Sequence, residues 1–418
     1  MSSVLPIEII ALIIDNVGEN EDTDLLKELA LVSHSFLQIC RKHLFATVEL
    51  HDAISTRRSH VASSKMGFVK LLQSRPDIVK YVRKLTYKAG YCHRFGLLSA
   101  STSLKGDDHL LSPILPNFLR TIPRLNCLTI TASSLDWNKL DSSLKSAFLH
   151  LMHLPTINHI DLSHFRNFPL SSLTPSVNLR RLDLSFMESF GRSPGIIQSE
   201  MVPKIREFHT SGSSRLTTKL LYVEGQDGRP AFNFMELRRF SMSFTDPEDE
   251  PNIRYLLQIA KSLEELHLSV GFDQSLVGLH DILSPSARTL KVLDLTVTSY
   301  DYSIDLPLAG LCEELEAMAG HNMLEALSIK VHIGDNTETE DFIGSIIQKV
   351  ENVLVKPGWS ALRQVSFQVS IPCCLLSKED SAKLSRALQS LPDKYLSHLP
   401  KLESVAFNYS AYVTECDF

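Results

Sequence analysis

The feature that most constrains this chain is a recurring apolar pattern, in which one aliphatic residue is followed by a second three positions later and by a third after two more. The clearest copies begin at Leu125, Ile157, Leu179, Leu263, Leu290 and Leu324, and looser copies begin at Val82, Ile205, Leu237, Leu362 and Leu402. The last two apolar residues of each copy alternate with a polar one, which is the period of a strand with one buried face. Each copy therefore predicts a short strand.

The copies recur roughly every 22 to 43 residues, which brackets the period of leucine-rich repeats. One such unit cannot bury its own apolar face, so neighbouring units are expected to stack with their strands side by side. Segments between copies carry helical stripes, as in residues 342–353, that would cover one side of the strands. The expected fold class is α/β, with a small helical N-terminal domain followed by an irregular leucine-rich-repeat solenoid that contains a parallel sheet.

The repeats depart from the regular pattern after the strand. Regular leucine-rich repeats place Asn or Cys three residues after the last aliphatic residue, where the side chains form a ladder. Here those positions hold residues such as Phe165, Met187 and Thr298. We therefore expect the backbone turns to be satisfied in another way and the curvature to be uneven.

The first fifty residues carry a different pattern, in which apolar residues recur at the three-and-four spacing of helices. Pro6 suits the start of a first helix, and Gly18 is expected to end it. Asp24 and Ser33 are expected to cap a second and a third helix. A unit this small cannot bury all of its aliphatic side chains, so some must contact either a partner or the following domain.

The order of three short segments in this region carries a resemblance: Leu5-Pro6-x-Glu8-Ile9, then Leu-Ala-Leu-Val-Ser-x-x-Phe at 29–36, then Cys-Arg-x-x-Leu-Phe at 40–45. Together they resemble an F-box, in the form abundant in mushroom-forming (basidiomycete) fungi, over residues 2 to about 50. The second helix is looser than a typical F-box, because Lys27 and Glu28 precede Leu29.

The resemblance implies a partner. F-box helices bind a Skp-type adaptor, which links to a cullin that carries the ubiquitin-transfer machinery. Carried over to this sequence, the contact residues would be Leu5, Pro6, Ile9, Ile13, Leu25, Leu29, Val32 and Phe36.

The expected domains are an F-box helical domain at 1–50, a linker with connecting helices at 51–81, and the solenoid at 82–418. A target protein would bind the exposed column of the predicted strands. The candidates are Asp161, Arg181, Asp183, His209, Arg239, Glu265, His267 and Asp294. Strand alternation by itself places polar residues on a solvated face, so an ordinary solvated face stays open as the alternative.

The composition of the chain limits the classes of partner that we expect it to bind. The net charge of −6 provides no basic field for nucleic acid or for an anionic membrane, and no apolar run is long enough to span a bilayer. The seven cysteines lack the spacings of a zinc site or a disulfide framework, which favours a reducing compartment, the cytoplasm or the nucleus. We expect protein partners, with no cofactor and no metal.

An enzyme is the alternative class of protein to a binding protein. Residues 191–195 match the G-x-S-x-G pattern of hydrolases, but Pro194 follows Ser193 and has no N–H to offer an oxyanion hole. No phosphate-binding glycine loop, dinucleotide fingerprint or zinc helix occurs in the sequence. The predicted function is that of a substrate-recognition adaptor in an SCF-type cullin-RING ubiquitin ligase, acting by proximity and without catalytic residues. The alternative is a leucine-rich protein-interaction scaffold unconnected to ubiquitination.

Overall fold

The structure is a computed structural model of the 418-residue chain. It describes residues 6–20, 22–52, 69, 72, 74–89, 114–188, 202–212, 220–221, 231–244, 249–271, 277–299, 310–333, 339–373, 378–399 and 404–415. The chain forms two compact units. Unit 1 comprises Met1–Pro203 and Gly225–Ala231, and unit 2 comprises Lys204–Glu224 and Phe232–Phe418. This division falls inside the segment for which the sequence predicts a single solenoid.

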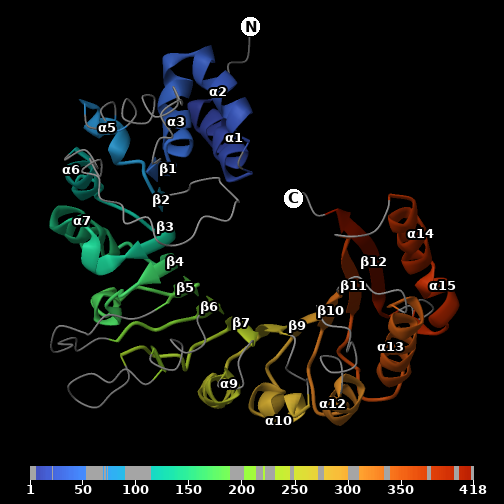
Figure 1. Ribbon diagram of the computed structural model, residues 1–418. Helices are drawn as coiled ribbons and strands as arrows, with labels where there is room; N and C mark the ends of the chain where they lie inside the picture. The colour runs from blue at the N-terminus through green and yellow to red at the C-terminus, as the bar shows by residue number, and fades with distance from the viewer. Residues whose placement is uncertain are drawn as a thin grey trace, which may run out of the picture. The chain divides into compact units, whose positions relative to one another are not determined.

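Unit 1 begins with three helices and continues with parallel strands in chain order (Figure 1). The helices are α1 (Ile7–Glu19), α2 (Thr23–Val32) and α3 (His34–Leu44). The strands are β1 (Thr47–Asp52), β2 (Lys84–Ala89), β3 (Cys127–Asp136), β4 (His159–Arg166) and β5 (Arg181–Ser185). Between the strands lie α5 (Pro76–Val79), α6 (Ile114–Arg120), α7 (Ser142–Met152) and the 3-10 turns Trp137–Lys139 and Leu170–Leu173. The repeat pattern does not predict β1, which begins within the region expected to be helical.

Unit 2 contains the remaining strands, again parallel and in chain order. They are β6 (Glu207–Ser211), β7 (Arg239–Phe244), β8 (Glu265–Val270), β9 (Val292–Ser299), β10 (Ala326–Ile333), β11 (Gln364–Cys373) and β12 (Ala406–Glu415). The helices are α9 (Asp249–Ile259), α10 (Leu279–Leu283), α12 (Leu311–Met318), α13 (Thr339–Leu354), α14 (Lys378–Gln389) and α15 (Leu391–Tyr395), with a 3-10 turn at Ser284–Ser286. All of these helices lie on one side of the strands, and in the described part of unit 2 the other side carries no helix (Figure 1).

A strand forms at every predicted copy of the apolar pattern, from β2 to β12. The predicted α/β class with a parallel sheet is therefore confirmed. The apolar residues of the pattern form buried columns, as where Leu128 of β3 lies opposite Ile160 of β4, both fully buried. In unit 2 the column includes Phe208 and Phe240, whose rings stack with centroids 5.9 Å apart.

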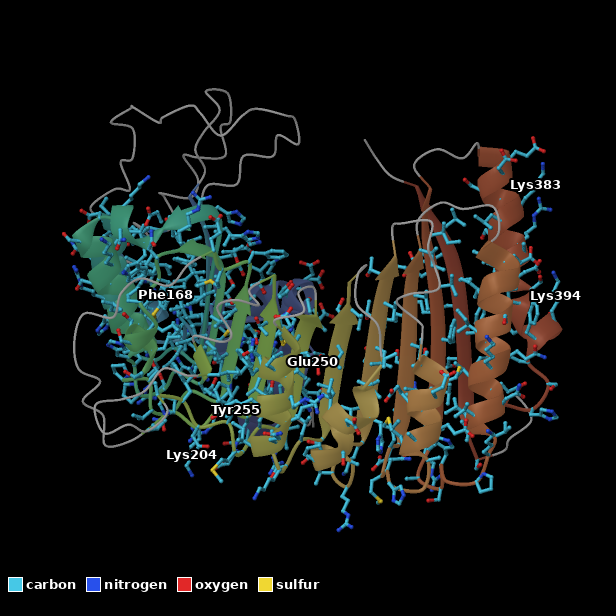
Figure 2. The ribbon with its side chains drawn as sticks, turned by 60° about the horizontal axis from the view of Figure 1, so that its bottom comes forward. Phe168, Lys204, Glu250, Tyr255, Lys383 and Lys394 are labelled. Atoms are coloured by element: carbon cyan, nitrogen blue, oxygen red, sulfur yellow. The ribbon has the colours of Figure 1, made fainter. Side chains whose placement is uncertain are left out.

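The helical layer of unit 2 carries ion pairs on its surface, one between helices and one within a helix. Lys394 of α15 pairs with Glu340 of α13, and Lys383 of α14 pairs with Glu379 one turn earlier, at 3.0 Å (Figure 2). Most of these side chains are more than half exposed, so water and salt screen the pairs and each contributes little to stability. Burial of the apolar columns, rather than surface charge, therefore holds the helices on the strands.

Successive repeats are linked before each strand by their backbone. The carbonyl oxygen of Ala46 accepts the N–H groups of Arg83 and Lys84, both at 2.8 Å. The same pattern, one carbonyl accepting two N–H groups of the next repeat, recurs at Arg83, Asn126, Asn158, Arg206, Arg238, Glu264, Lys291 and Glu325. Buried backbone groups must find partners, and this ladder supplies them without any particular side chain.

Near the end of β4 and directly after β5 the chain turns through residues in the left-handed region, His164 (φ 60) and Phe186 (φ 51). Their rings stack with centroids 4.7 Å apart. The next residues, Phe165 and Met187, are buried at the positions where a regular repeat would place Asn or Cys. Apolar packing therefore replaces the side-chain ladder at these two turns, as the missing Asn and Cys residues led us to expect.

The N-terminal helices begin close to the predicted positions, but one cap differs. Asp22, rather than Asp24, caps α2, because its carboxylate accepts the N–H of Leu25 at 3.0 Å. Asp24 lies in the first turn and pairs with Lys27 at 2.7 Å. Ser33 caps α3 as predicted, accepting the N–H of Phe36 at 3.2 Å.

Gly18 has a packing role and does not end α1, which continues to Glu19. A Cβ atom at this position would lie 2.2 Å from Nδ1 of His43 in α3. His43 is itself held by Asp15 of α1, with 2.8 Å between Nε2 and Oδ1. Only glycine therefore allows α1 and α3 to approach this closely.

Replacing Gly18 with alanine is expected to lower the free energy of unfolding by about 1–2 kcal/mol, because overpacking outweighs the higher helix propensity of alanine. Urea unfolding of the full chain, with hydrogen exchange read in α1 and α3, measures the change. Glu19→Ala, at an exposed position of the same helix, is the matched control. If Gly18→Ala were as stable as the control or more so, the close contact would not constrain the helix pair.

Candidate functional site

The N-terminal helices leave several large apolar side chains exposed. The exposed residues of α1 and α2 are Ile7, Ile9, Leu12, Ile13, Leu25, Leu31 and Val32. Leu31 and Val32 are the most exposed of them, at 87% and 65%. Folded chains seldom leave so many large aliphatic groups in water unless the surface contacts something. We refer to these seven residues as the exposed apolar set.

The same helices also have a core of their own. Ile14, Leu26 and Cys40 are fully buried at its centre. The residues packed around them are Ile10, Val17, Leu29, Ala30, Phe36, Ile39 and Leu44. Because this core is complete without the exposed apolar set, that set is not needed to hold the three helices together.

The structure divides the predicted adaptor contacts into two groups. Pro6, Ile9, Ile13, Leu25 and Val32 are exposed, while Leu29 and Phe36 pack against the core of the helices. Leu5 lies outside the described residues. The exposed residues Ile7, Leu12 and Leu31 were not predicted as contacts, although helical spacing from the partly buried Ile10 and the buried Ile14 places Leu12 on the outer side.

The predicted target-binding residues all lie on strands, where they alternate with buried residues. In unit 1 they are Asp161 of β4 and Arg181 and Asp183 of β5. In unit 2 they are His209 of β6, Arg239 of β7, Glu265 and His267 of β8, and Asp294 of β9. The buried neighbours, such as Ile160 and Leu162 in β4, belong to the apolar columns. The predicted residues therefore point away from those columns.

In unit 1 the structure joins Arg181 and Asp183 to two residues that the sequence analysis did not select, His159 and Cys127. Nε2 of His159 lies 3.0 Å from Oδ2 of Asp183, and Nδ1 lies 3.1 Å from Sγ of Cys127. Arg181 donates to the same carboxylate from Nη2 at 2.9 Å. Asp183 is buried, so both cations lie against a carboxylate that water hardly reaches.

The ionisation of this cluster follows from its contacts. Burial works against the charged form of His159, but the hydrogen bonds to Asp183 and Cys127 outweigh it and raise the pKa of His159 to about 9. Burial likewise opposes the charge on Asp183, and the hydrogen bonds from His159 and Arg181 overcome it and lower its pKa. At neutral pH the two groups therefore form a buried ion pair.

In unit 2 two separate clusters form on the same strand column. Arg239 pairs with Glu207 of β6 at 3.3 Å and with Glu265 of β8 at 2.9 Å, which makes an ion ladder over three strands. Arg239 is about half exposed, so water and salt screen this ladder. The ladder therefore contributes little to the stability of the fold.

The second cluster centres on Asp294 of β9. Oδ2 of Asp294 accepts hydrogen bonds from Nζ of Lys330 at 2.8 Å and from Nδ1 of His267 at 3.3 Å. Burial opposes the charge of Asp294, and these two donors nevertheless lower its pKa. His209 lies two strands away from His267, opposite Ser241 of β7. Lys330 was missed by the sequence analysis, because only the strand register brings it beside Asp294.

The described residues contain no group of three or more His, Cys, Asp or Glu side chains placed to hold a metal ion. The hydrolase-like segment around Ser193 lies outside the residues that the structure describes. In the described part of the chain, no helix combines the length and the apolar character that a membrane crossing requires. Comparison with known proteins finds no family whose model matches this chain and no curated protein that is similar to it.

Proposed function

We propose that this protein is a substrate-recognition adaptor of an SCF-type cullin-RING ubiquitin ligase. In this proposal α1 to α3 are an F-box that binds a Skp-type adaptor, and the irregular leucine-rich repeats that follow bind a target protein. The observation that carries the proposal is the exposed apolar set on α1 and α2, beside a core that is complete without it. Cytoplasm or nucleus is the proposed location.

The exposed residues support the proposal because they overlap with the contacts that the F-box resemblance implies. Of those contacts, Ile9, Ile13, Leu25 and Val32 are exposed large apolar side chains. Burying a side chain of this kind against a partner contributes about 1.5–3 kcal/mol. Several such side chains would suffice for a stable protein–protein contact, even after the entropic cost of association.

The connection between the helices and the strands suits an adaptor. Only Phe45 and Ala46 separate α3 from β1, and the carbonyl of Ala46 is the first member of the backbone ladder. A target held on the strands of unit 1 would therefore be tied closely to whatever binds α1 and α2. Such proximity is the whole chemical contribution of a ligase adaptor, because it replaces a bimolecular encounter with a local one.

Co-purification of the full chain with a fungal Skp-type adaptor tests the proposal. Ile13→Asp and Val32→Asp are each expected to weaken binding at least tenfold, because each places a charge in an apolar contact. Met235→Asp, at an exposed apolar position of unit 2, is the matched control and should bind like the wild type. Circular dichroism would verify that all three variants fold.

Two results would count against the adaptor function. If the folded wild-type chain did not bind, the N-terminal helices would be a cap on the repeats, and the protein would be a scaffold unconnected to ubiquitination. If both aspartate variants bound as tightly as Met235→Asp, the adaptor would contact another surface and the exposed apolar set would need another partner.

A further inference from the structure

A cysteine, a histidine and an aspartate lie in contact across three neighbouring strands of unit 1. Cys127 is directly opposite His159 in the register of β3 and β4, and Asp183 lies two residues beyond Arg181, the partner of His159 in β5. The resulting contacts are 3.1 Å from Sγ to Nδ1 and 3.0 Å from Nε2 to Oδ2. Both ring nitrogens are therefore engaged, one by sulfur and one by a carboxylate.

The carboxylate determines how the ring is protonated. An ionised carboxylate can only accept hydrogen bonds, so Nε2 of His159 must carry a hydrogen that it donates to Asp183. Arg181 donates to the same carboxylate from Nε and Nη2 and keeps it in place. The raised pKa of His159, about 9, favours a second hydrogen on Nδ1, directed at the sulfur. In that state the sulfur accepts a hydrogen bond, and the thiolate is its better acceptor form.

Charged side chains of the neighbouring strands lie around the cysteine, histidine and aspartate. Lys84 of β2 is opposite Cys127, and Lys88 lies four residues farther along the same strand, where it pairs with Glu49 of β1. Asp161 of β4 lies two residues beyond His159. Lys84 therefore lies on the β2 side of the sulfur, and Arg181, which pairs with Asp183, lies on the β5 side, while the charge of Lys88 is balanced by Glu49. Nearby cations stabilise a thiolate and attract anionic reagents.

Cys127 also lies outside the apolar core. Cys127 is half-buried, on a strand column that points away from the apolar columns and the helices packed on them. The other described free cysteines contrast with it. Cys40 is buried, and burial raises its pKa, while burial and the nearby Glu313 raise the pKa of Cys312. They are the internal reference thiols for any reactivity measurement.

We propose that Cys127 is a site of reversible thiol–disulfide exchange with small anionic disulfides, prepared as a thiolate by His159 and positioned through Asp183 and Arg181. The thiolate attacks one sulfur of the disulfide, a new S–S bond to Cys127 forms, and the original S–S bond breaks. The departing thiolate leaves with the electron pair and takes a proton from water. Cys127 is oxidised and the released half of the small disulfide is reduced, so no other oxidant is needed.

The attached group would lie on the strand column that the proposed function assigns to the target, and its removal by a thiol would clear that surface. The chemistry at Cys127 does not depend on that function, however. Its test needs neither a Skp-type adaptor nor a target protein. Failure of one proposal therefore leaves the other standing.

The test follows alkylation of the reduced full chain by iodoacetamide between pH 5.5 and 9.5, with peptide mapping of each cysteine. We expect alkylation of Cys127 to persist toward the acid end of this range, where ordinary thiols, with a pKa near ~8.5, react slowly. His159→Gln is expected to slow alkylation at pH 6.5 roughly tenfold. Without the imidazolium a smaller fraction of Cys127 is thiolate, and this loss outweighs the greater intrinsic nucleophilicity of a more basic thiolate. Incubation with glutathione disulfide should add one glutathione to Cys127 before Cys40 or Cys312.

The wild-type profile decides the outcome even if His159→Gln fails to fold, and Asp183→Asn provides a second variant that keeps the shape of the side chain. The proposal is overturned if Cys127 follows the profile of an ordinary thiol, or if folded His159→Gln reacts at the wild-type rate at pH 6.5. It is also overturned if glutathione is added to Cys312 as fast as to Cys127. Arg181→Gln should produce a smaller change than His159→Gln, because Arg181 acts only through Asp183.

Discussion

Replacing Glu351 with alanine is expected to lower the free energy of unfolding of unit 2 by about 3–5 kcal/mol. Glu351 lies on α13 and is only 1% exposed. Its carboxylate accepts the N–H groups of Ser397, His398 and Leu399 at 3.0, 2.8 and 2.8 Å. Alanine would leave these three donors without their acceptor, and the N–H of Leu399 is buried.

Burial opposes the charge of Glu351, but the three backbone donors outweigh burial and lower the pKa of this carboxyl group. A carboxyl group whose pKa is lower in the folded state stabilises the protein above the pKa of the unfolded chain, about 4.3. That contribution disappears as the pH falls through the folded-state value. Wild-type unit 2 should therefore lose stability in acid more steeply than Glu351→Gln.

Urea unfolding, together with hydrogen exchange at residues 396–399, measures the effect of Glu351→Ala. Glu316→Ala is the matched control, because Glu316 pairs with Lys356 on the surface and its loss should cost at most about 1 kcal/mol. If Glu351→Ala were no less stable than Glu316→Ala, the turn at Ser397–Leu399 would have other acceptors. Glu351 would then have no special role.

The stability of unit 1 is expected to fall as the pH rises from about 6.5 to about 9. The pKa of His159 is raised in the folded state, to about 9, against 6.5 in the unfolded chain. A group with a raised pKa stabilises the fold fully below the unfolded value and loses that contribution as the pH passes through the folded value. The shift corresponds to a loss of at most about 3 kcal/mol, and solvent screening reduces it toward about 1–2 kcal/mol.

Nuclear magnetic resonance of labelled histidines gives the titration of His159 directly, and urea unfolding at pH 6, 7.5 and 9 gives the stability. Asp183→Asn should bring the titration of His159 down toward 6.5 and flatten the pH dependence of unit 1. His153→Gln is the control, because His153 is exposed, hydrogen-bonds the carbonyl of Ser172 and should leave the profile unchanged when replaced. A flat wild-type profile between pH 6.5 and 9 would show that the buried ion pair does not form.

Much of the fold could be predicted from the sequence, because its signals are local. A strand with one buried face is encoded by apolar residues two positions apart, and β2 to β12 all form where that pattern occurs. The cap at Ser33 is similarly local, since the hydroxyl accepts an N–H only three residues away. The cap of α2 was misplaced by two residues because Asp22 and Asp24 are both suitable, and only the backbone path selects Asp22.

The candidate sites were only partly predictable. Alternation identified Arg181 and Asp183 as outward-facing residues, but it did not identify His159 or Cys127 as their neighbours. For the N-terminal helices, the contacts that the resemblance implies include Leu29 and Phe36, which are partly buried and pack against the core of the three helices. Deciding which side of a helix is inside requires the positions of the other two helices.

The sequence by itself determined the α/β class, the positions of the repeat strands and the three N-terminal helices, because each depends on residues a few positions apart. Only the tertiary structure decided that β1 joins the sheet, that Gly18 admits His43, and that Glu351 holds a turn 46 to 48 residues away. Those contacts depend on strand register and on the lengths of the intervening segments. The residues next to a side chain in the sequence do not indicate a partner that comes into contact with it only when the chain has folded.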